Sequence, residues 1–150
     1  MKRRVFMLLS LATLVACSSS PGGKFLVDGI SFVYEEGWAV TDQEDFDGQG
    51  YYVSLEKDGI NSSGLFVLTW LYDSLDQDES LEKYKEELKN NIIYRNSDLE
   101  FTKPVDDEFS GIPSRSVRFT LGLLGVDHEG VIHVFYGPDF TVFVMKQEAI

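Results

Sequence analysis

The order of hydrophobic and polar residues predicts a chain that consists mainly of β-strands. Residues 51–57 alternate between apolar and mostly polar positions, and this period of two is typical of a strand with one buried face. Residues 137–139 read Gly-Pro-Asp, which predicts a turn between two further strands. Comparable apolar runs, and therefore further predicted strands, lie at residues 30–34, 65–72, 115–121, 131–136 and 140–145.

One amphipathic helix is predicted over residues 76–94. Asp76 can cap its first turn, and Glu79 follows three residues later, as in a capping box. Four apolar residues recur at helical spacing and form a stripe for packing, while charged residues fill the opposite, solvated face. The stripe comprises Leu81, Tyr84, Leu88 and Ile92.

These elements predict an α+β fold in which an antiparallel sheet packs against a helix. The runs at 65–72, 131–136 and 140–145 are apolar on both sides, so both faces of the sheet need cover. A single helix covers one face. The cover of the other face is missing, or comes from the N-terminal segment, or from a partner. Residues 146–150 resemble the beginning of a helix, so we expect the chain to lack a C-terminal helix.

The first residues have the pattern of an export signal. Basic residues at 2–4 precede an almost wholly apolar run at 5–15, and the small residue Ala16 stands directly before Cys17. This order is typical of a secretory signal, and the run is shorter than the roughly 20 residues that span a bilayer. The alternatives are an ordinary signal with an unrelated cysteine, or a short buried helix.

Residues 14–17, Leu-Val-Ala-Cys, resemble the lipobox of bacterial lipoproteins. The resemblance implies cleavage between Ala16 and Cys17, followed by lipidation of the Cys17 thiol. Acyl chains on this residue would anchor the chain to a membrane, because each buried methylene contributes about 0.8 kcal/mol.

The resemblance divides the chain into three parts. Residues 1–16 would be the signal peptide, residues 17–24 the lipidated cysteine with a flexible tether, and residues 25–150 a single domain. Cys17 is the only cysteine, so no internal disulfide can form. Ser18 is similar to the residue that follows the cysteine in lipoproteins that leave the inner membrane. In a cell with two membranes, this implies a place in the cell envelope at the outer membrane, facing the periplasm.

The charge of the chain argues against nucleic acid as a partner. The whole chain carries 13 basic and 25 acidic residues, a net charge of −12. Loss of residues 1–16 removes three basic and no acidic residues, so the remainder has 10 − 25 = −15. Nucleic acids and anionic lipids favour surfaces rich in Lys and Arg. Solubility alone is a sufficient reason for an acidic surface.

Residues 34–38, Tyr-Glu-Glu-Gly-Trp, resemble the Tyr-Pro-x-Gly-Trp segment of the PsbP-like (DcrB-like) superfamily, with Glu35 in place of the proline. The order of elements over residues 25–150 is also similar: a hairpin, a helix, a Gly-Ile-Pro turn at 111–113, and three long strands. The resemblance implies an antiparallel sheet between helices, an αβα sandwich, here without the family's final helix. It also implies a non-enzymatic role in binding or assembly, and it supplies no catalytic residue.

An acidic segment is similar to a calcium-binding EF-hand loop. Asp45, Asp47, Gly50 and Glu56 occupy positions one, three, six and twelve of such a loop. Position nine holds Val53, and the flanking segments are predicted as strands where an EF-hand has helices. The alternative is a solvated acidic turn between two strands.

Two pairs of side chains are further candidates for function. Tyr51 and Tyr52 lie beside the acidic turn and predict a partner-binding rim, because tyrosines favour interfaces; they are otherwise ordinary strand residues. His128 and His133 are five residues apart on a predicted strand, so they point to opposite faces and would not share a metal. We expect His133 to pack in the sheet and His128 to lie in a polar turn.

These observations favour a membrane-anchored envelope lipoprotein that acts as a non-enzymatic protein-binding or assembly module. Its partner would be an unknown envelope protein. The sequence contains no Gly-x-Ser-x-Gly elbow and no P-loop. The alternatives are a weak calcium or small-ligand binding protein, and a hydrolase that uses paired carboxylates from the acidic clusters at 73–79 and 106–108.

Overall fold

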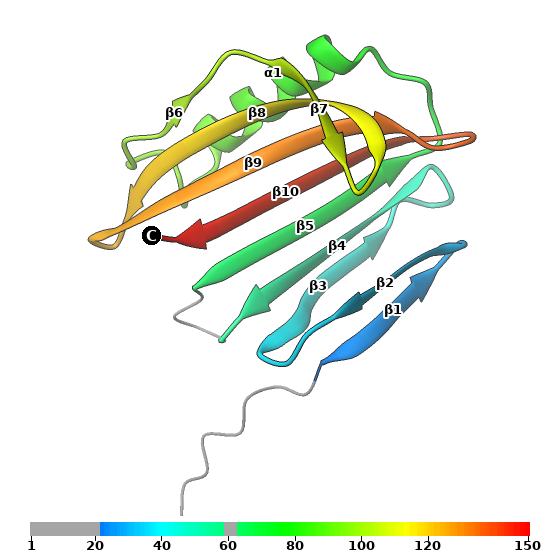
Figure 1. Cartoon of the computed structure of the whole chain (residues 1–150), viewed down its shortest axis with the longest axis horizontal. Helices are drawn as coiled ribbons and strands as arrows, with labels where there is room; N and C mark the ends of the chain where they lie inside the picture. The colour runs from blue at the N-terminus through cyan, green and yellow to red at the C-terminus, as the bar shows by residue number, and fades with distance from the viewer. Residues whose placement is uncertain (1–21, 59–62) are drawn as a thin grey trace, which may run out of the picture.

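The computed structural model describes residues 22–58 and 63–150 (Figure 1). The predicted signal peptide, the cleavage site at Ala16 and the lipidation site at Cys17 lie outside these residues. Within the described part of the chain, no helix combines the length and the apolar character that crossing a membrane requires.

An antiparallel sheet of eight strands forms the centre of the structure, and with one helix it confirms the predicted α+β class. Every predicted strand is present, and the last three extend beyond their predicted bounds because their pairing continues through less apolar residues. Along the sheet the order is β3 (Trp38–Asp45), β4 (Gly50–Lys57), β5 (Gly64–Leu71), β10 (Thr141–Ala149), β9 (Val126–Tyr136), β8 (Ile112–Leu123) and β6 (Glu100–Phe101), with β7 (Val105–Phe109) paired to β8 as well.

Helix α1 (Gln77–Asn90) packs on one face of the sheet, as predicted, and covers the half of that face at β8 and β9. Its N-cap is Asp76, whose Oδ1 accepts the backbone N–H of Glu79 at 2.9 Å. The Glu79 carboxylate binds Lys83 at 2.8 Å instead of returning to the cap, so the capping box is only half formed. The stripe residues Leu81 and Leu88 are buried in the core.

The predicted length of this helix was wrong at its C-terminal end. The helix ends at Asn90, and residues 91–97 form turns. Ile92 was expected on the buried stripe. It is instead 76% exposed, because the helical path stops before reaching it.

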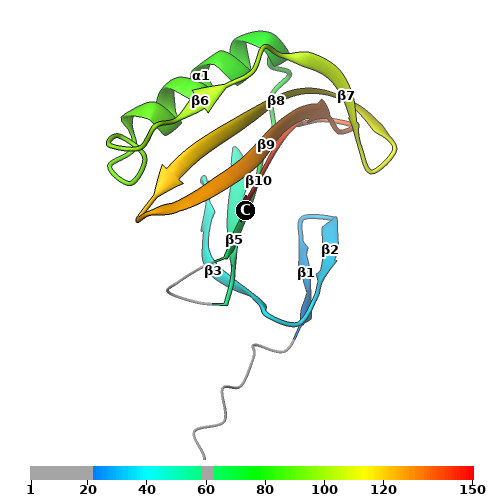
Figure 2. The same ribbon diagram turned by 60° about the vertical axis from the view of Figure 1, so that its left-hand side comes forward.

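A β-hairpin of β1 (Gly23–Val27) and β2 (Ile30–Tyr34) covers the other face (Figure 2). Phe25 stacks on Phe32 with ring centroids 5.0 Å apart, and it also contacts Tyr51 of β4 at 6.2 Å. Phe32 contacts Phe66 of β5 at 5.8 Å. Cover for this face therefore comes from the N-terminal segment, which was one of the three alternatives that the sequence left open. The covering element is a hairpin and not a helix.

Strand β10 corrects the expectation that a helix begins at residue 146. Lys146 pairs with Phe66 on one side and with Val131 on the other, so the backbone stays extended to Ala149. Gln147 is buried and its side chain accepts a hydrogen bond from Tyr94, which holds this end of the strand in the core. Pairing on both edges outweighs the helix-forming composition of these residues.

Candidate functional site

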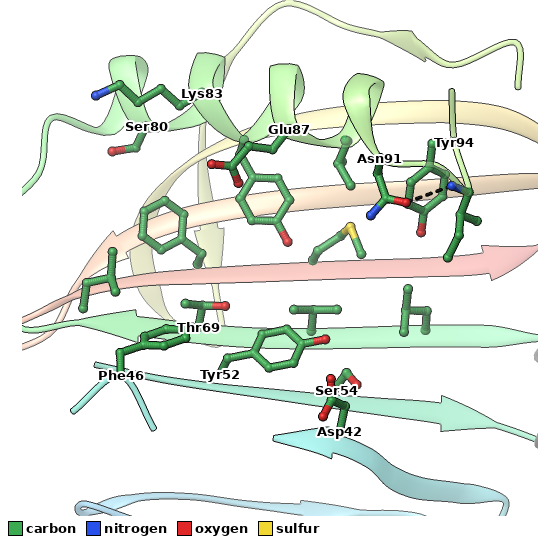
Figure 3. A pocket seen from close by; sticks show the side chains of 18 of the residues that line it. Asp42, Phe46, Tyr52, Ser54, Thr69, Ser80, Lys83, Glu87, Asn91 and Tyr94 are labelled. Carbon is green, nitrogen blue, oxygen red and sulfur yellow. Dashed lines mark hydrogen bonds between the residues drawn. The ribbon is translucent and has the colours of Figure 1, made fainter. Parts of the chain in front are cut away.

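A groove lies between helix α1 and the half of the sheet that the helix does not cover. The helix packs over β8 and β9, so the same face of β4 and β5 stays open beside it (Figure 3). The groove has a volume of about 740 Å³. This size is typical of sites that bind small molecules or the side chains of a partner.

The floor of the groove consists of two rows of side chains that cross three strands. Because side chains alternate along a strand, positions paired across β4, β5 and β10 point to the same face. The floor is apolar at both of its β10 positions, and it carries hydroxyl groups on β4 and β5. The first row is Tyr52, Thr69 and Phe143, and the second is Ser54, Val67 and Met145.

The wall of the groove is one side of helix α1 (Figure 3). Tyr84 stacks on Phe143 of the floor, with ring centroids 6.1 Å apart. Burial raises the pKa of the Tyr84 phenol well above its usual value, so this side chain stays neutral. The other wall residues follow the same line of the helix, at Ser80, Glu87, Leu88 and Asn91.

Residues 91–94 close one end of the groove. The side chain of Asn91 accepts the backbone N–H of Ile93 at 2.9 Å, which fixes the turn after the helix (Figure 3). The Tyr94 hydroxyl donates to Gln147 Oε1 at 3.0 Å. Burial raises the pKa of Tyr94, so it too stays neutral at physiological pH.

The rim of the groove is acidic. Five carboxylates line it, against one cation, Lys83, which is already paired with Glu79 at 2.8 Å. The groove thus combines a neutral, largely apolar interior with negative charge at its opening. The acidic lining residues are Asp42, Glu56, Asp76, Glu79 and Glu87.

The structure does not bring the predicted calcium ligands together. Asp45 ends β3 and pairs with Tyr51, whereas Glu56 lies five residues further along β4, roughly 17 Å away at 3.4 Å per residue. Asp45 Oδ1 accepts the N–H of Gly48 at 3.0 Å, as in a tight turn, and Asp47 has a positive φ of 55° in that turn. Among the described residues, no three His, Cys, Asp or Glu side chains gather where they could hold a metal ion.

The predicted tyrosine rim is divided between the two faces of the sheet. Tyr51 stacks on Trp70 at 5.0 Å on the face covered by the hairpin, and it donates to Gln43 Oε1 at 3.0 Å. Tyr52 lies on the floor of the groove. Only Tyr52 therefore belongs to the candidate site.

The two histidines point to opposite faces, as predicted. His133 Nδ1 lies 3.0 Å from Ser114 Oγ, and His128 Nδ1 lies 3.4 Å from Gln147 Nε2. Both are buried. The expectation that His128 lies in a polar turn was wrong, because β9 begins two residues earlier at Val126 and carries His128 into the core.

The acidic clusters considered for hydrolysis make structural contacts. Asp76 caps α1, and Asp78 and Asp106 both bind Arg115, at 2.9 and 3.0 Å. Asp107 accepts a hydrogen bond from Ser116 Oγ at 2.7 Å, and this bond lowers the pKa of the Asp107 carboxyl.

The sequence reading missed the groove, although it contained one usable signal. Ser54 pairs beside Val67, Thr69 pairs beside Phe143, and Ser80 interrupts the apolar side of the helix, so small hydroxyl residues recur among apolar ones on these facing surfaces. Small polar residues on facing surfaces indicate that the surfaces do not pack tightly there.

Comparison with known proteins leaves the chain without an established family. No known family matches it, and no curated protein is significantly similar to it. A solved structure of a protein of unknown function from Pseudomonas aeruginosa matches with a TM-score of 0.39 and 10% identity, over 86% of this chain and 83% of that one. A likeness this distant carries no argument about function.

Proposed function

We propose that this protein is a lipid-anchored binding module of the cell envelope, without enzymatic activity, and that the groove beside α1 is its binding site. The lipobox-like segment at residues 14–17 supports the anchor and the location. The order of hairpin, helix and three long strands supports a PsbP-like relationship, in which binding and assembly roles are usual.

The observation that carries the proposal is the pairing of an apolar floor with an acidic rim. Phe143 and Met145 offer apolar contact, and Glu56 and Glu87 stand at the opening. A positively charged amphipathic segment of a partner protein fits this arrangement. Its apolar side chains would enter the groove, and its Lys or Arg residues would lie against the rim.

A designed peptide tests this proposal with a defined probe. The probe is a 14-residue helix with leucines on one face and lysines on the other. The double variant Asp42→Lys/Glu87→Lys should bind it about tenfold more weakly at low salt, since each charge at such a rim contributes on the order of 0.5–1 kcal/mol. Fluorescence anisotropy of the labelled peptide measures the affinity.

The matched control is Glu35→Lys/Glu108→Lys, which makes the same charge change at exposed positions outside the groove lining. It should bind the peptide nearly as well as the parent protein. A second variant, Thr69→Trp, fills the floor and should block binding without changing any charge. Equal loss of affinity in both charge variants would mean that only net charge matters, and the groove proposal would fail.

The volume of the groove favours one second candidate, a small apolar ligand. About 740 Å³ lies within the 300–1,000 Å³ range of such sites. A neutral dye such as Nile red should then bind one-to-one and be excluded by Thr69→Trp. Dye binding without peptide binding would favour this second function over protein docking.

A further inference from the structure

One end of the molecule exposes several large apolar side chains. Leu124, in the turn between β8 and β9, is 97% exposed, and Val126 beside it is 45% exposed. Ile92, in the turn after α1, is 76% exposed. We call Ile92, Leu124 and Val126 the apolar end.

Ile92 and Leu124 lie in two turns, and Val126 begins β9 directly after the second turn; the fold brings all three to the same end. Tyr94, two residues after Ile92, bonds to Gln147 of β10, and Gln147 lies 3.4 Å from His128 of β9. His128 is two residues from Val126 along the same strand. The turn after the helix and the β8–β9 turn therefore lie at the same end of the sheet (Figure 1).

The N-terminal end of the described chain leaves from this end too. A Cβ on Gly22 would meet the Tyr34–Glu36 backbone, so Gly22 lies just before the start of β3. From there a continuous row of paired residues crosses the sheet to Thr120, three residues before the end of β8. The row is Trp38, Lys57, Gly64, Glu148, Glu129 and Thr120.

The tether is too short to hold this end far from a membrane. Four residues lie between Cys17 and Gly22, so five residue-to-residue steps join them and reach at most roughly 18 Å. The row of strands from β3 to β8 is itself about 24 Å wide, at 4.8 Å per spacing. A domain attached through Cys17 therefore keeps the start of β3 within about 18 Å of the lipid, and Leu124 reaches the lipid when the shared end of the strands faces the membrane.

The backbone at Leu124 is unfavourable for this residue. Its φ is 53°, in the left-handed region where Gly and Asn are favoured in two-residue hairpin turns. Leu124 makes no packing contribution in return, because nearly all of its surface is exposed. An apolar side chain that is both strained and uncovered points to a contact outside the chain.

We infer that the apolar end inserts into the surface of the lipid bilayer, so that the domain stands on the membrane through two contacts, the acyl anchor and this end. The inference rests on the lipid anchor of the proposed function. The charges beside Leu124 and Val126 favour zwitterionic over anionic lipid, because residues 119–145 contain no Lys or Arg while Asp127 and Glu129 follow the exposed turn. Lys89 and Arg95 flank Ile92 at the other turn.

Quenching by brominated lipid tests the inference on the lipidated full-length protein in phosphatidylcholine vesicles. Tryptophan is introduced as Leu124→Trp, and the matched control is Tyr136→Trp, an exposed position at the opposite end of β9. The native tryptophans, Trp38 and Trp70, are common to both variants. We expect chain-brominated phosphatidylcholine to quench the added emission of Leu124→Trp at least twofold more than that of Tyr136→Trp.

A second experiment tests the contact with lipid without introducing a tryptophan. A photoreactive phospholipid should label the β8–β9 turn of the parent protein, and Leu124→Asn/Val126→Asn should reduce that label severalfold. Replacing half of the lipid with phosphatidylglycerol should also reduce it at low salt. Equal quenching at both positions, or labelling unchanged by the double variant, overturns the inference.

Flotation with the vesicles separates this inference from the proposed anchor. A chain that fails to float has no lipid anchor, and the proposed localisation then fails. A chain that floats but keeps Leu124→Trp unquenched is anchored, and only the inference is overturned.

Discussion

His133 is enclosed between strands of the sheet and the ring of Phe109, whose centroid lies 5.4 Å away. Burial lowers the pKa of His133, and the positive charge of Arg118 adds to this, while the nearby Asp107 carboxylate opposes it. The folded protein therefore holds a neutral imidazole that shares a hydrogen bond with Ser114.

This lowered pKa predicts that stability falls in mild acid. In the unfolded chain the imidazole titrates near its usual pKa of about 6.5. As the pH falls below that value, the unfolded state takes up a proton before the folded state does, so the free energy of unfolding decreases. Urea unfolding between pH 7.5 and 5 should show this decrease in the parent protein and a smaller one in His133→Gln. The matched variant His128→Gln should keep the decrease, and equal slopes in all three would contradict the assignment to His133.

At the scale of elements, the strands and the helix could be predicted because their signals are local. The alternation in β4 and the cap at Asp76 depend on a few neighbouring residues only. The end of α1 and the fate of residues 146–150 could not be read in this way. Pairing with β5 and β9, which are distant in the sequence, decides that Lys146 stays in a strand.

The difference between local signals and long-range pairing also explains which parts of the candidate site could be predicted. Alternation alone places Tyr51 and Tyr52 on opposite faces, so a rim containing both was excluded by the pattern itself. The groove depends on where α1 crosses the sheet. That position follows from the order β5-β10-β9, which brings the last described strand between earlier ones, and no short pattern in the sequence contains that order.

The hairpin of β1 and β2 should be essential for stability, because it covers β4 and β5 on one face of the sheet. Phe25→Ala removes a buried ring that contacts Phe32 and Tyr51, and it should lower the free energy of unfolding by roughly 3–5 kcal/mol. Val33→Ala, on the exposed side of the same hairpin, should change it by less than about 0.5 kcal/mol. Urea titration measures both, and a small effect of Phe25→Ala would show that the hairpin packs only loosely.

At the scale of the whole molecule, negative charge dominates. Residues 17–150 carry −15, and each described ion pair has at least one exposed partner, so each contributes little stability. Repulsion among the carboxylates therefore works against the folded state at low ionic strength.

Salt should relieve this repulsion. Raising NaCl from 20 to 500 mM shortens the screening length from about 20 Å to below 5 Å, and it should raise the midpoint of thermal unfolding by a few degrees. The variant Glu35→Lys/Glu108→Lys, whose net charge is four units less negative, should respond less. A midpoint that falls with salt in the parent protein would mean that attractive ion pairs outweigh the repulsion.

The central position of β10 has a consequence for how the protein is made. Residues 141–149 join β5 to β9, so the early and late halves of the sheet stay separate until this late segment has been synthesised. During synthesis of residues 1–140 the growing chain therefore cannot complete its native sheet, although most of these residues have by then left the ribosome. If the chain is exported as proposed, this delay would keep the polypeptide unfolded for passage through a narrow export pore, and the sheet would be completed on the far side.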